Sequence, residues 1–239
     1  MASEPSSKRS DAAVATPVEL LASSTFSRIL LCRRSDDNLP IVIKSTSLSD
    51  TPTATRAHKE ATLAAAMDSP FFMCVRGWRV TETHAHLLLE YLPGGDVELL
   101  IDREGSLNAA TARFYCGCLA LGLEALHDMS ILHRDVKPDN LCIGSDGYAR
   151  IVDLAYATVL SSDDGRAHTL LGTPEYLSPE AFTGRGQSYP SDMWAFGISL
   201  YTMLLAAHPW DGDGDNPQSL YANVLNKAPF FPLNIISKQ

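Results

Sequence analysis

Two aspartates, a lysine and an asparagine stand close together in the middle of this 239-residue chain. Asp135 and Asp153 offer carboxylates, Lys137 offers a cation, and Asn140 offers a neutral oxygen ligand. Phosphoryl transfer needs a carboxylate that accepts the proton of the attacking hydroxyl, a cation beside the moving phosphate, and oxygen ligands for Mg²⁺. These four side chains could supply all of them if the fold gathers them around one point.

The residues between these side chains predict a β-hairpin that could gather them. Residues 141–143 and 149–152 have the composition of short strands, and the polar turn between them ends in Gly147. A hairpin brings its two ends together, so it could place Asn140 beside Asp153. The alternative is a polar surface loop whose charges are accidental.

The motif HRDVKPDN at residues 133–140 makes this interpretation specific. It resembles the catalytic loop of eukaryotic protein kinases, and a lysine two residues after the aspartate is typical of their serine/threonine branch. The resemblance implies that Asp135 positions the hydroxyl or accepts its proton and that Lys137 steadies the phosphate. It also implies that Asn140 and Asp153 bind the metal and that the cofactors are ATP and Mg²⁺.

The resemblance covers nearly all of residues 18–232 and implies an α+β, bilobal fold. We expect a small antiparallel β-sheet N-lobe over residues 18–91 and a mainly helical C-lobe over residues 92–239. Residues 1–17 are rich in serine, alanine and charge without periodicity, which predicts a disordered segment. Because the C-lobe of a complete kinase has several more helices, the resemblance predicts that this C-lobe is truncated.

Hydrophobic periodicity predicts the individual elements. The expected strands are 26–33, 41–44, 71–75 and 86–91, and a strong helical pattern covers 55–67. A turn at 92–96 is expected between the lobes, followed by helices at 109–129, 191–205 and 218–226.

Lys44 interrupts an apolar strand, and Glu60 lies in the middle of the first predicted helix. Taken alone, these could be a surface lysine and a residue of a solvated helix face. In protein kinases a strand lysine and a helix glutamate at about this separation form an ion pair that directs the lysine to the α- and β-phosphates. The resemblance therefore implies that Lys44 and Glu60 belong to the nucleotide site.

The nucleotide site departs most from the family at its glycine-rich loop. The glycine positions fall on Ala22, Ser24 and Ser27, so the loop is degenerate. Glycine lets the backbone approach phosphates and adopt positive φ, and a side chain there costs about 1 kcal/mol in conformation. By the same resemblance, adenine would meet Val42, Leu89 as gatekeeper, and the backbone of Glu90 and Leu92.

Residues 169–180, TLLGTPEYLSPE, form a second specific motif. It resembles the activation segment of AGC-group kinases, most closely those dependent on cyclic nucleotides. The resemblance implies that an upstream kinase phosphorylates Thr169 and that Arg134 and Arg56 bind the phosphate. The alternative is an unmodified loop threonine, because Thr158 stands where a further basic contact is usual.

The same motif implies contacts with a protein substrate. Thr173 matches the hydroxyl that bonds the catalytic carboxylate in serine/threonine kinases. Leu170, Pro174 and Leu177 match an apolar pocket for the residue that follows the phosphoacceptor.

Four further carboxylates have expected roles by resemblance. Asp192 matches a buried residue that bonds the backbone of the catalytic loop, and Glu180 matches a structural glutamate. Asp96 and Asp139 match positions that recognise basic residues in a substrate, whereas a third such position is Ala222.

Composition narrows the compartment and the partners. The formal net charge of −9 argues against a nucleic-acid scaffold and favours basic protein partners. Five cysteines without a CxxC pair indicate reduced thiols, and no apolar run reaches membrane-spanning length. We expect a cytoplasmic or nuclear location, no nucleic acid, no membrane span, and a protein substrate with basic residues near serine or threonine.

Two functions fit these motifs. The first is a serine/threonine protein kinase that transfers the γ-phosphoryl of Mg-ATP to protein hydroxyls. The alternative is a weak or inactive pseudokinase that acts as a binding scaffold. Every charged catalytic residue is present, whereas the loop glycines are replaced and Ala155 stands where the activation-segment switch has glycine. Because pseudokinases usually lose a charged residue first, the enzyme is favoured.

Overall fold

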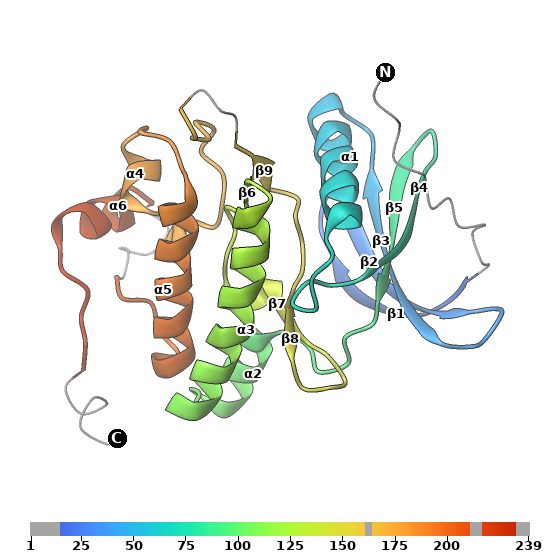
Figure 1. Ribbon diagram of the computed structural model, residues 1–239, viewed down its shortest axis with the longest axis horizontal. Coiled ribbons are helices and arrows are strands. Elements are labelled where there is room, and N and C mark those ends of the chain that lie inside the picture. Colours follow the sequence, from blue (N-terminus) through green and yellow to red (C-terminus); the bar gives the residue numbers. More distant parts are fainter. Residues whose placement is uncertain (1–14, 161–163, 211–216, 233–239) are drawn as a thin grey trace.

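The computed structural model describes residues 15–160, 164–210 and 217–232. Within them the chain forms two lobes that lie side by side, with a β-sheet and one long helix in the first and mostly helices in the second (Figure 1). This is the α+β, bilobal architecture expected from the sequence.

The N-lobe is a five-stranded antiparallel sheet in the order β1-β2-β3-β5-β4. Its strands are β1 (Ala15–Ser23), β2 (Ser27–Arg34), β3 (Pro40–Ser47), β4 (Val75–Val80) and β5 (His84–Glu90). The register pairs Lys44 with Leu87 and Val42 with Leu89. Three expected nucleotide-site residues therefore lie on two adjacent strands in the middle of the sheet.

Helix α1 (Thr51–Ala66) packs against this sheet and begins earlier than the predicted range 55–67. Asp50 caps it, accepting hydrogen bonds from the backbone nitrogen of Thr53 at 2.8 Å and from its hydroxyl at 2.9 Å. Glu60 is buried on the inner face of the helix, so the cap and the sheet together fix where this carboxylate points.

The prediction of disorder over residues 1–17 is wrong for residues 15–17. They form the start of β1 and pair with Cys32, Arg33 and Arg34 of β2, because β2 offers an open edge for another strand. The other residues of that segment, 1–14, lie outside the described residues.

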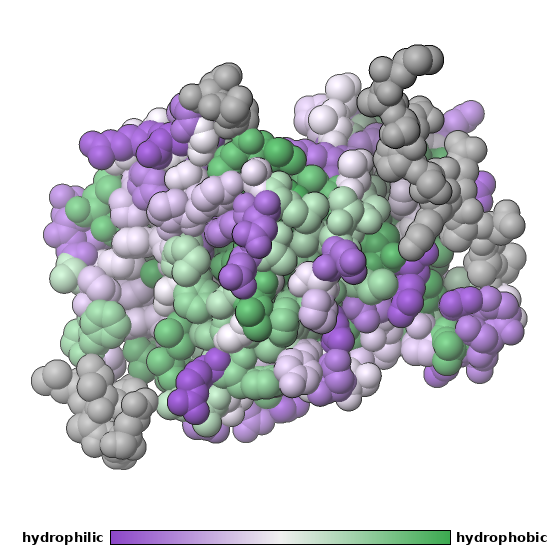
Figure 2. All heavy atoms as spheres, in the orientation of Figure 1, coloured by the Kyte–Doolittle hydropathy of each residue, from purple (hydrophilic) through white to green (hydrophobic). Residues whose placement is uncertain are grey.

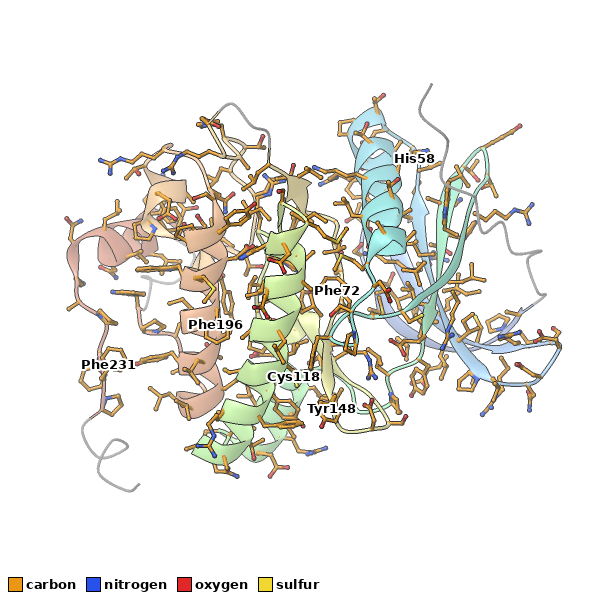
Figure 3. All side chains as sticks on the ribbon, viewed as in Figure 1. His58, Phe72, Cys118, Tyr148, Phe196 and Phe231 are labelled. Atoms are coloured by element: carbon orange, nitrogen blue, oxygen red, sulfur yellow. The ribbon has the colours of Figure 1, made fainter. Side chains whose placement is uncertain are left out.

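The predicted strand at 71–75 is also wrong. The chain makes an isolated bridge from Phe72 to Ile151, and the strand β4 begins only at Val75. The apolar pattern has a different cause, since Phe72 is buried against the C-lobe rather than in the sheet. Figure 3 shows Phe72 in the region between the two lobes.

The C-lobe is built on α3 (Ala109–Asp128) and α5 (Tyr189–Leu205), which pack side by side (Figure 1). Around them lie α2 (Val97–Glu104), α4 (Pro179–Phe182) and α6 (Pro217–Asn226). Helix α2 was not expected from the sequence, and it starts where Asp96 caps its first turn. Over the described residues, no helix combines the length and apolarity needed to cross a membrane.

Two short, two-stranded antiparallel sheets lie next to the catalytic motif. Strands β7 (Leu141–Ile143) and β8 (Ala149–Ile151) form the predicted hairpin, and β6 (Ile131–Leu132) pairs with β9 (Thr158–Val159).

The main hydrophobic core extends into both lobes. It joins Leu63 of α1 and Phe72 to Leu123, Ile151 and Leu154 of the C-lobe. Hydrophobic residues also gather at the surface in the middle of the face drawn in Figure 2, between the two lobes. Because Leu63 and Ile151 belong to one core, the C-terminal end of α1 packs into the same core that supports the catalytic hairpin.

Candidate active site

Asp135 is held by hydrogen bonds from two residues, Thr173 and Asn140. Thr173 donates to its Oδ1 from both the hydroxyl at 2.7 Å and the backbone nitrogen at 3.0 Å. Asn140 Nδ2 donates to its Oδ2 at 2.9 Å and to its carbonyl oxygen at 2.7 Å, which leaves the Asn140 amide oxygen available as a ligand. Lys137 Nζ donates to the Thr173 hydroxyl at 2.9 Å and lies 3.8 Å from Asp135 Oδ2. The Thr173 hydroxyl therefore holds the Asp135 carboxylate and the Lys137 ammonium close to each other.

Asp192 supports the catalytic loop from below, as expected. Its buried carboxylate accepts the backbone N–H groups of His133 and Arg134, each at 2.9 Å, and lies 2.9 Å from His127 Nε2. Arg134 has φ of 68°, an unusual conformation for a residue with a side chain. The carboxylate satisfies the backbone where the chain makes this turn, so the orientation of Asp135 depends on it.

Lys44, Glu60 and Asp153 form a charged group between the lobes. Lys44 Nζ donates to Glu60 Oε1 at 2.6 Å and to Asp153 Oδ1 at 3.0 Å. Burial opposes the charge of Lys44, but the carboxylates of Asp153 and Glu60 outweigh it and raise the pKa of the lysine. Burial raises the pKa of Glu60, with Lys44 only partly offsetting it. Burial would also raise the pKa of Asp153, yet Lys44 and the Ala155 amide together lower it.

A cavity of about 280 Å³ lies between the sheet and the hairpin β7–β8. It contains the expected nucleotide residues except for the two serines, and it also contains both expected metal ligands. Of the residues expected to belong to the site, those that line this cavity are Ala22, Val42, Lys44, Glu60, Leu89, Glu90, Leu92, Asp96, Asp139, Asn140 and Asp153. Cys142 forms part of the same wall, and burial raises the pKa of its thiol to about 12, so it is an uncharged contact.

In the turn between β1 and β2, two serines stand where the family has glycine, and they form hydrogen bonds with each other. Ser24 Oγ lies 3.0 Å from Ser27 Oγ and accepts the Ser27 backbone N–H at 3.1 Å. The Ser24 backbone N–H donates to the carbonyl oxygen of Ser27 at 2.8 Å. Both serines line a cavity of about 160 Å³ together with Lys44 and Asp153. The hydroxyls therefore lie at the mouth of the phosphate side of the site.

Residues 153–155, Asp-Leu-Ala, hold the expected metal ligand Asp153 in a fixed backbone conformation. Asp153 has φ of 59°, and its Oδ1 accepts the Ala155 backbone N–H at 3.0 Å. Leu154 is 2% exposed and packs in the core that joins the two lobes. Asp153 thus faces the nucleotide cavity while Leu154 anchors the segment beneath it.

Thr169 is exposed, and one of its two expected cations is beside it. Arg134 Nη1 donates to the Thr169 carbonyl oxygen at 3.3 Å, and Arg134 Nε donates to the Tyr156 carbonyl oxygen at 2.8 Å. Arg134 is thereby held at the start of the activation segment, next to the residue whose phosphorylation is expected.

The second expected cation, Arg56, lies elsewhere. Its guanidinium donates to Thr53 Oγ1 at 3.3 Å and lines the smaller cavity beside Lys44. Lys59, three residues further along α1, reaches the activation segment instead, donating to Thr158 Oγ1 at 2.8 Å. The structure thus shows Arg56 bonded to Thr53 within its own helix, and a contact of Arg56 with a phosphate on Thr169 stays a prediction.

The expected substrate pocket is only partly enclosed. Leu177 is buried, whereas Pro174 is exposed and Leu170 is 51% exposed. Gly172 has φ of 128°, and a Cβ there would lie 2.5 Å from the carbonyl oxygen of Arg134. Glycine is required at this position because the activation segment passes directly over the catalytic loop.

Three carboxylates lie along the entrance to the site. Asp139 is exposed, and Asp96 accepts the Leu99 backbone N–H at 2.7 Å as the cap of α2. Glu98 was not predicted. Its Oε2 is buried without a hydrogen-bond partner among the described residues, and burial together with Asp139 and Asp102 raises its pKa. The predicted position Ala222 offers no carboxylate, so negative charge at the entrance comes from α2 and the catalytic loop.

Glu180 has a local partner in the C-lobe. Its Oε1 accepts the hydroxyl of Ser191 at 2.5 Å, which ties the end of the activation segment to the first turn of α5. This bond gives the Glu180 carboxylate a partner within the described residues, whereas its expected structural role stays a prediction.

Lys59, Glu98 and Cys142 are the site residues that sequence reasoning missed. The spacing of Lys59 from Glu60 carried a signal, since adjacent residues on a helix point about 100° apart and could serve two different partners. Glu98 stands in the first turn of a helix, where a carboxylate has a common alternative explanation. Cys142 lies two residues after the expected metal ligand Asn140, on a strand whose side chains alternate in direction.

Comparisons with known proteins agree with this geometry. A family model described as protein kinase domain matches residues 16–232. The chain is 30% identical over 223 residues to Protein kinase C-like 1 of Caenorhabditis elegans, which covers 91% of this chain and 31% of that protein. It is 31% identical over 219 residues to Protein kinase C delta type of Mus musculus, covering 90% and 32%.

The resemblance to cyclic-nucleotide-dependent kinases is also found. The chain is 30% identical over 219 residues to the cGMP-dependent protein kinase of Toxoplasma gondii, covering 90% of this chain and 22% of that protein. The chain spans about a third or less of the length of these three relatives. With the catalytic motifs, the bilobal fold and the matched domain in agreement, the chain belongs to the protein kinase family, among relatives of the AGC group.

Proposed function

We propose that this chain transfers the γ-phosphoryl group of Mg-ATP to serine or threonine hydroxyls of proteins. The observation that carries the proposal is the fixed position of Asp135, held by Thr173 and Asn140 beside the cavity that Lys44 and Asp153 line. Preorganised charges of this kind supply most of the catalysis in phosphoryl transfer.

Each charged residue then has a separate task. Asn140 and Asp153 would hold the metal, and their two oxygens fit Mg²⁺, which is usually bound by one or two protein ligands together with phosphate oxygens. When bound, Mg-ATP would supply the phosphoryl group, and its Mg²⁺ would partly neutralise the phosphate charge. Lys44 orients the phosphates, Asp135 accepts the proton of the substrate hydroxyl, and Lys137 stabilises the charge on the phosphoryl group.

Binding of Mg-ATP can be tested by thermal unfolding. ATP with Mg²⁺ at about 100 times Kd should raise the unfolding midpoint by about 5–10 °C, because a ligand that binds only the folded state stabilises it. ATP without Mg²⁺ should give a smaller rise. Asp153→Asn should lose the Mg²⁺-dependent part, whereas Asp68→Asn, which changes an exposed aspartate after α1, should keep it. A folded protein that shows no Mg²⁺-dependent rise would contradict the proposal.

That negative result would instead favour a binding scaffold. The observation on its side is that Ser24 and Ser27 place side chains at the phosphate end of the site, where the family has glycine. A scaffold would retain the fold and its partner surfaces without nucleotide-dependent stabilisation.

We further propose that the substrates carry basic residues near the phosphoacceptor. Asp96 and Asp139 support this preference, because both line the cavity and bring negative charge to it. Charge complementarity of this kind directs partner choice more than it adds affinity. We also propose a cytoplasmic or nuclear location, where the chain would meet substrate proteins that carry basic residues near serine or threonine.

Substrate preference can be tested with charge-neutral variants. Asp96→Asn/Asp139→Asn should lower kcat/KM for an arginine-containing peptide by about tenfold, the effect of roughly 1.4 kcal/mol, and should barely change it for the alanine version of that peptide. Asparagine also caps helices, so α2 should stay intact. Equal losses on both peptides would show that the two aspartates do not recognise basic residues.

Thr169 is the proposed site for an upstream kinase. It is exposed, and Arg134 already contacts its backbone, so a phosphate there would meet a guanidinium. Phosphorylation is proposed to order the activation segment where the protein substrate binds.

A further inference from the structure

A side-chain bond that the chemistry above does not use connects the two lobes. Lys59 Nζ of α1 donates to Thr158 Oγ1 of β9 at 2.8 Å. Lys59 directly precedes Glu60, the residue that orients Lys44. One turn of α1 therefore carries both the catalytic ion pair and a contact with the C-lobe.

The far end of this bond lies at the base of the catalytic loop. Thr158 pairs with Leu132 in the β6–β9 sheet, and Leu132 is followed directly by residues 133–135 of the HRD motif. Arg134 Nε holds the same segment through the carbonyl oxygen of Tyr156 at 2.8 Å. The position of Thr158 is therefore coupled, through strand β6, to the position of the loop that carries Asp135.

The ion pair of Glu60 with Lys44 depends on the position of α1, because the 2.6 Å bond joins side chains of two different elements, the helix and strand β3. The C-terminal end of α1 is fixed by Leu63 in the shared core. Lys59 provides a second fixed point near Glu60, on the side of the helix that faces the activation segment.

The Lys59 ammonium lies in a part-buried position beside another cation. It is part-buried, and burial together with the charge of Arg134 lowers its pKa. The positive charge of Arg134 is unfavourable for the Lys59 ammonium, and the hydrogen bond to the Thr158 hydroxyl compensates for part of this cost. The bond joins two side chains of this chain and needs no modification of Thr169.

We propose that Lys59 is a positioning residue, whose bond to Thr158 holds α1 so that Glu60 stays on Lys44 whether or not Thr169 carries a phosphate. The inference rests on the proposed kinase function for its kinetic consequences. Its structural consequence, the order of α1, does not depend on activity.

Exchanging the two residues tests the bond directly. Lys59→Thr and Thr158→Lys alone should each lower kcat by about five- to tenfold with the peptide KM unchanged, as expected for loss of a hydrogen bond to a charged group at a part-exposed site. The double variant rebuilds the same pair from the opposite side and should return kcat to within about twofold of the parent. His58→Thr makes the same replacement at the neighbouring exposed position of α1 (Figure 3) and should leave kcat unchanged.

Two further readouts separate this inference from the proposed activity. Hydrogen exchange of the amides of α1 should be faster in each single variant and return to the parent rate in the double variant, even if the chain phosphorylates nothing. Protein treated with phosphatase should show the same pattern across the three variants. Failure of the double variant to recover in exchange would overturn the inference. Loss of α1 protection in the phosphatase-treated parent would show that a phosphate, and not Lys59, holds the helix.

Discussion

Replacing Asp135 with asparagine is expected to lower kcat by about 10³-fold, because general-base catalysis typically contributes 10²–10⁴-fold. Asparagine keeps an oxygen that can accept the two Thr173 hydrogen bonds. It loses the oxygen that accepts from Asn140 Nδ2, but the Asn140 bond to the backbone carbonyl of residue 135 remains and should keep the loop in shape. Without a carboxylate it can neither take up the hydroxyl proton nor balance the charge of Lys137. The measurement is steady-state phosphorylation of a peptide, with Mg-ATP binding followed by thermal shift.

The control for Asp135→Asn is Asp128→Asn, which removes an exposed aspartate at the end of α3. It should leave both kcat and nucleotide binding at the parent values. Unchanged kcat in Asp135→Asn would contradict the role of Asp135 as the base. Loss of the Mg-ATP shift in the same variant would show instead that the substitution disturbed the site as a whole.

The sequence predicted which residues lie together around Asp135 and Lys44, because short, specific motifs set their relations. Asp135 and Thr173 are 38 residues apart, and no local pattern joins them, yet both belong to recognisable motifs and lie 2.7 Å apart. Lys44 and Glu60 lie on different elements, and their pairing followed from the same resemblance. Composition and periodicity alone would have left the two residues as a surface lysine and a solvated glutamate.

The contacts between elements could not be predicted in this way. Whether Arg56 or Lys59 reaches the activation segment depends on the rotation of α1 about its axis, and that rotation is set by Asp50 at one end and by Leu63 in the core at the other. Residues three apart on a helix differ in direction by about 60°, so a modest rotation of α1 decides which of the two faces β9. The buried oxygen of Glu98 likewise depends on where α2 packs.

Errors at strand boundaries have a related physical cause. Residues 15–17 have no strand signal of their own and pair because β2 leaves an edge open. Residues 71–73 have an apolar signal, but Phe72 directs it to the core between the lobes rather than to a sheet. In both places the tertiary environment outweighs local preference, as is usual for β-structure.

Replacing Lys44 with methionine is expected to lower the free energy of unfolding by about 3–5 kcal/mol at about pH 7.5, because removing one partner of a buried pair leaves an uncompensated charge. The side chains of Lys44 and Glu60 are only 9% and 6% exposed, so water cannot replace the lost partner. Asp153 would also lie beside Glu60 with no cation between them. The measurement is urea-induced unfolding of the parent and the variant. Lys44→Met/Glu60→Gln should recover a large part of the loss, because it removes the unpaired charge as well.

The pH dependence separates charge from packing in this variant. Burial already raises the folded-state pKa of Glu60 above its unfolded value, and removing Lys44 takes away the main influence that lowers it. A raised carboxyl pKa means that the folded state binds the proton more tightly, so stability returns as pH falls through the folded pKa. The deficit of Lys44→Met relative to the parent should therefore shrink between about pH 7.5 and about pH 5.5. An equal deficit at both values would show that methionine packs badly and that the Glu60 charge is not the cause.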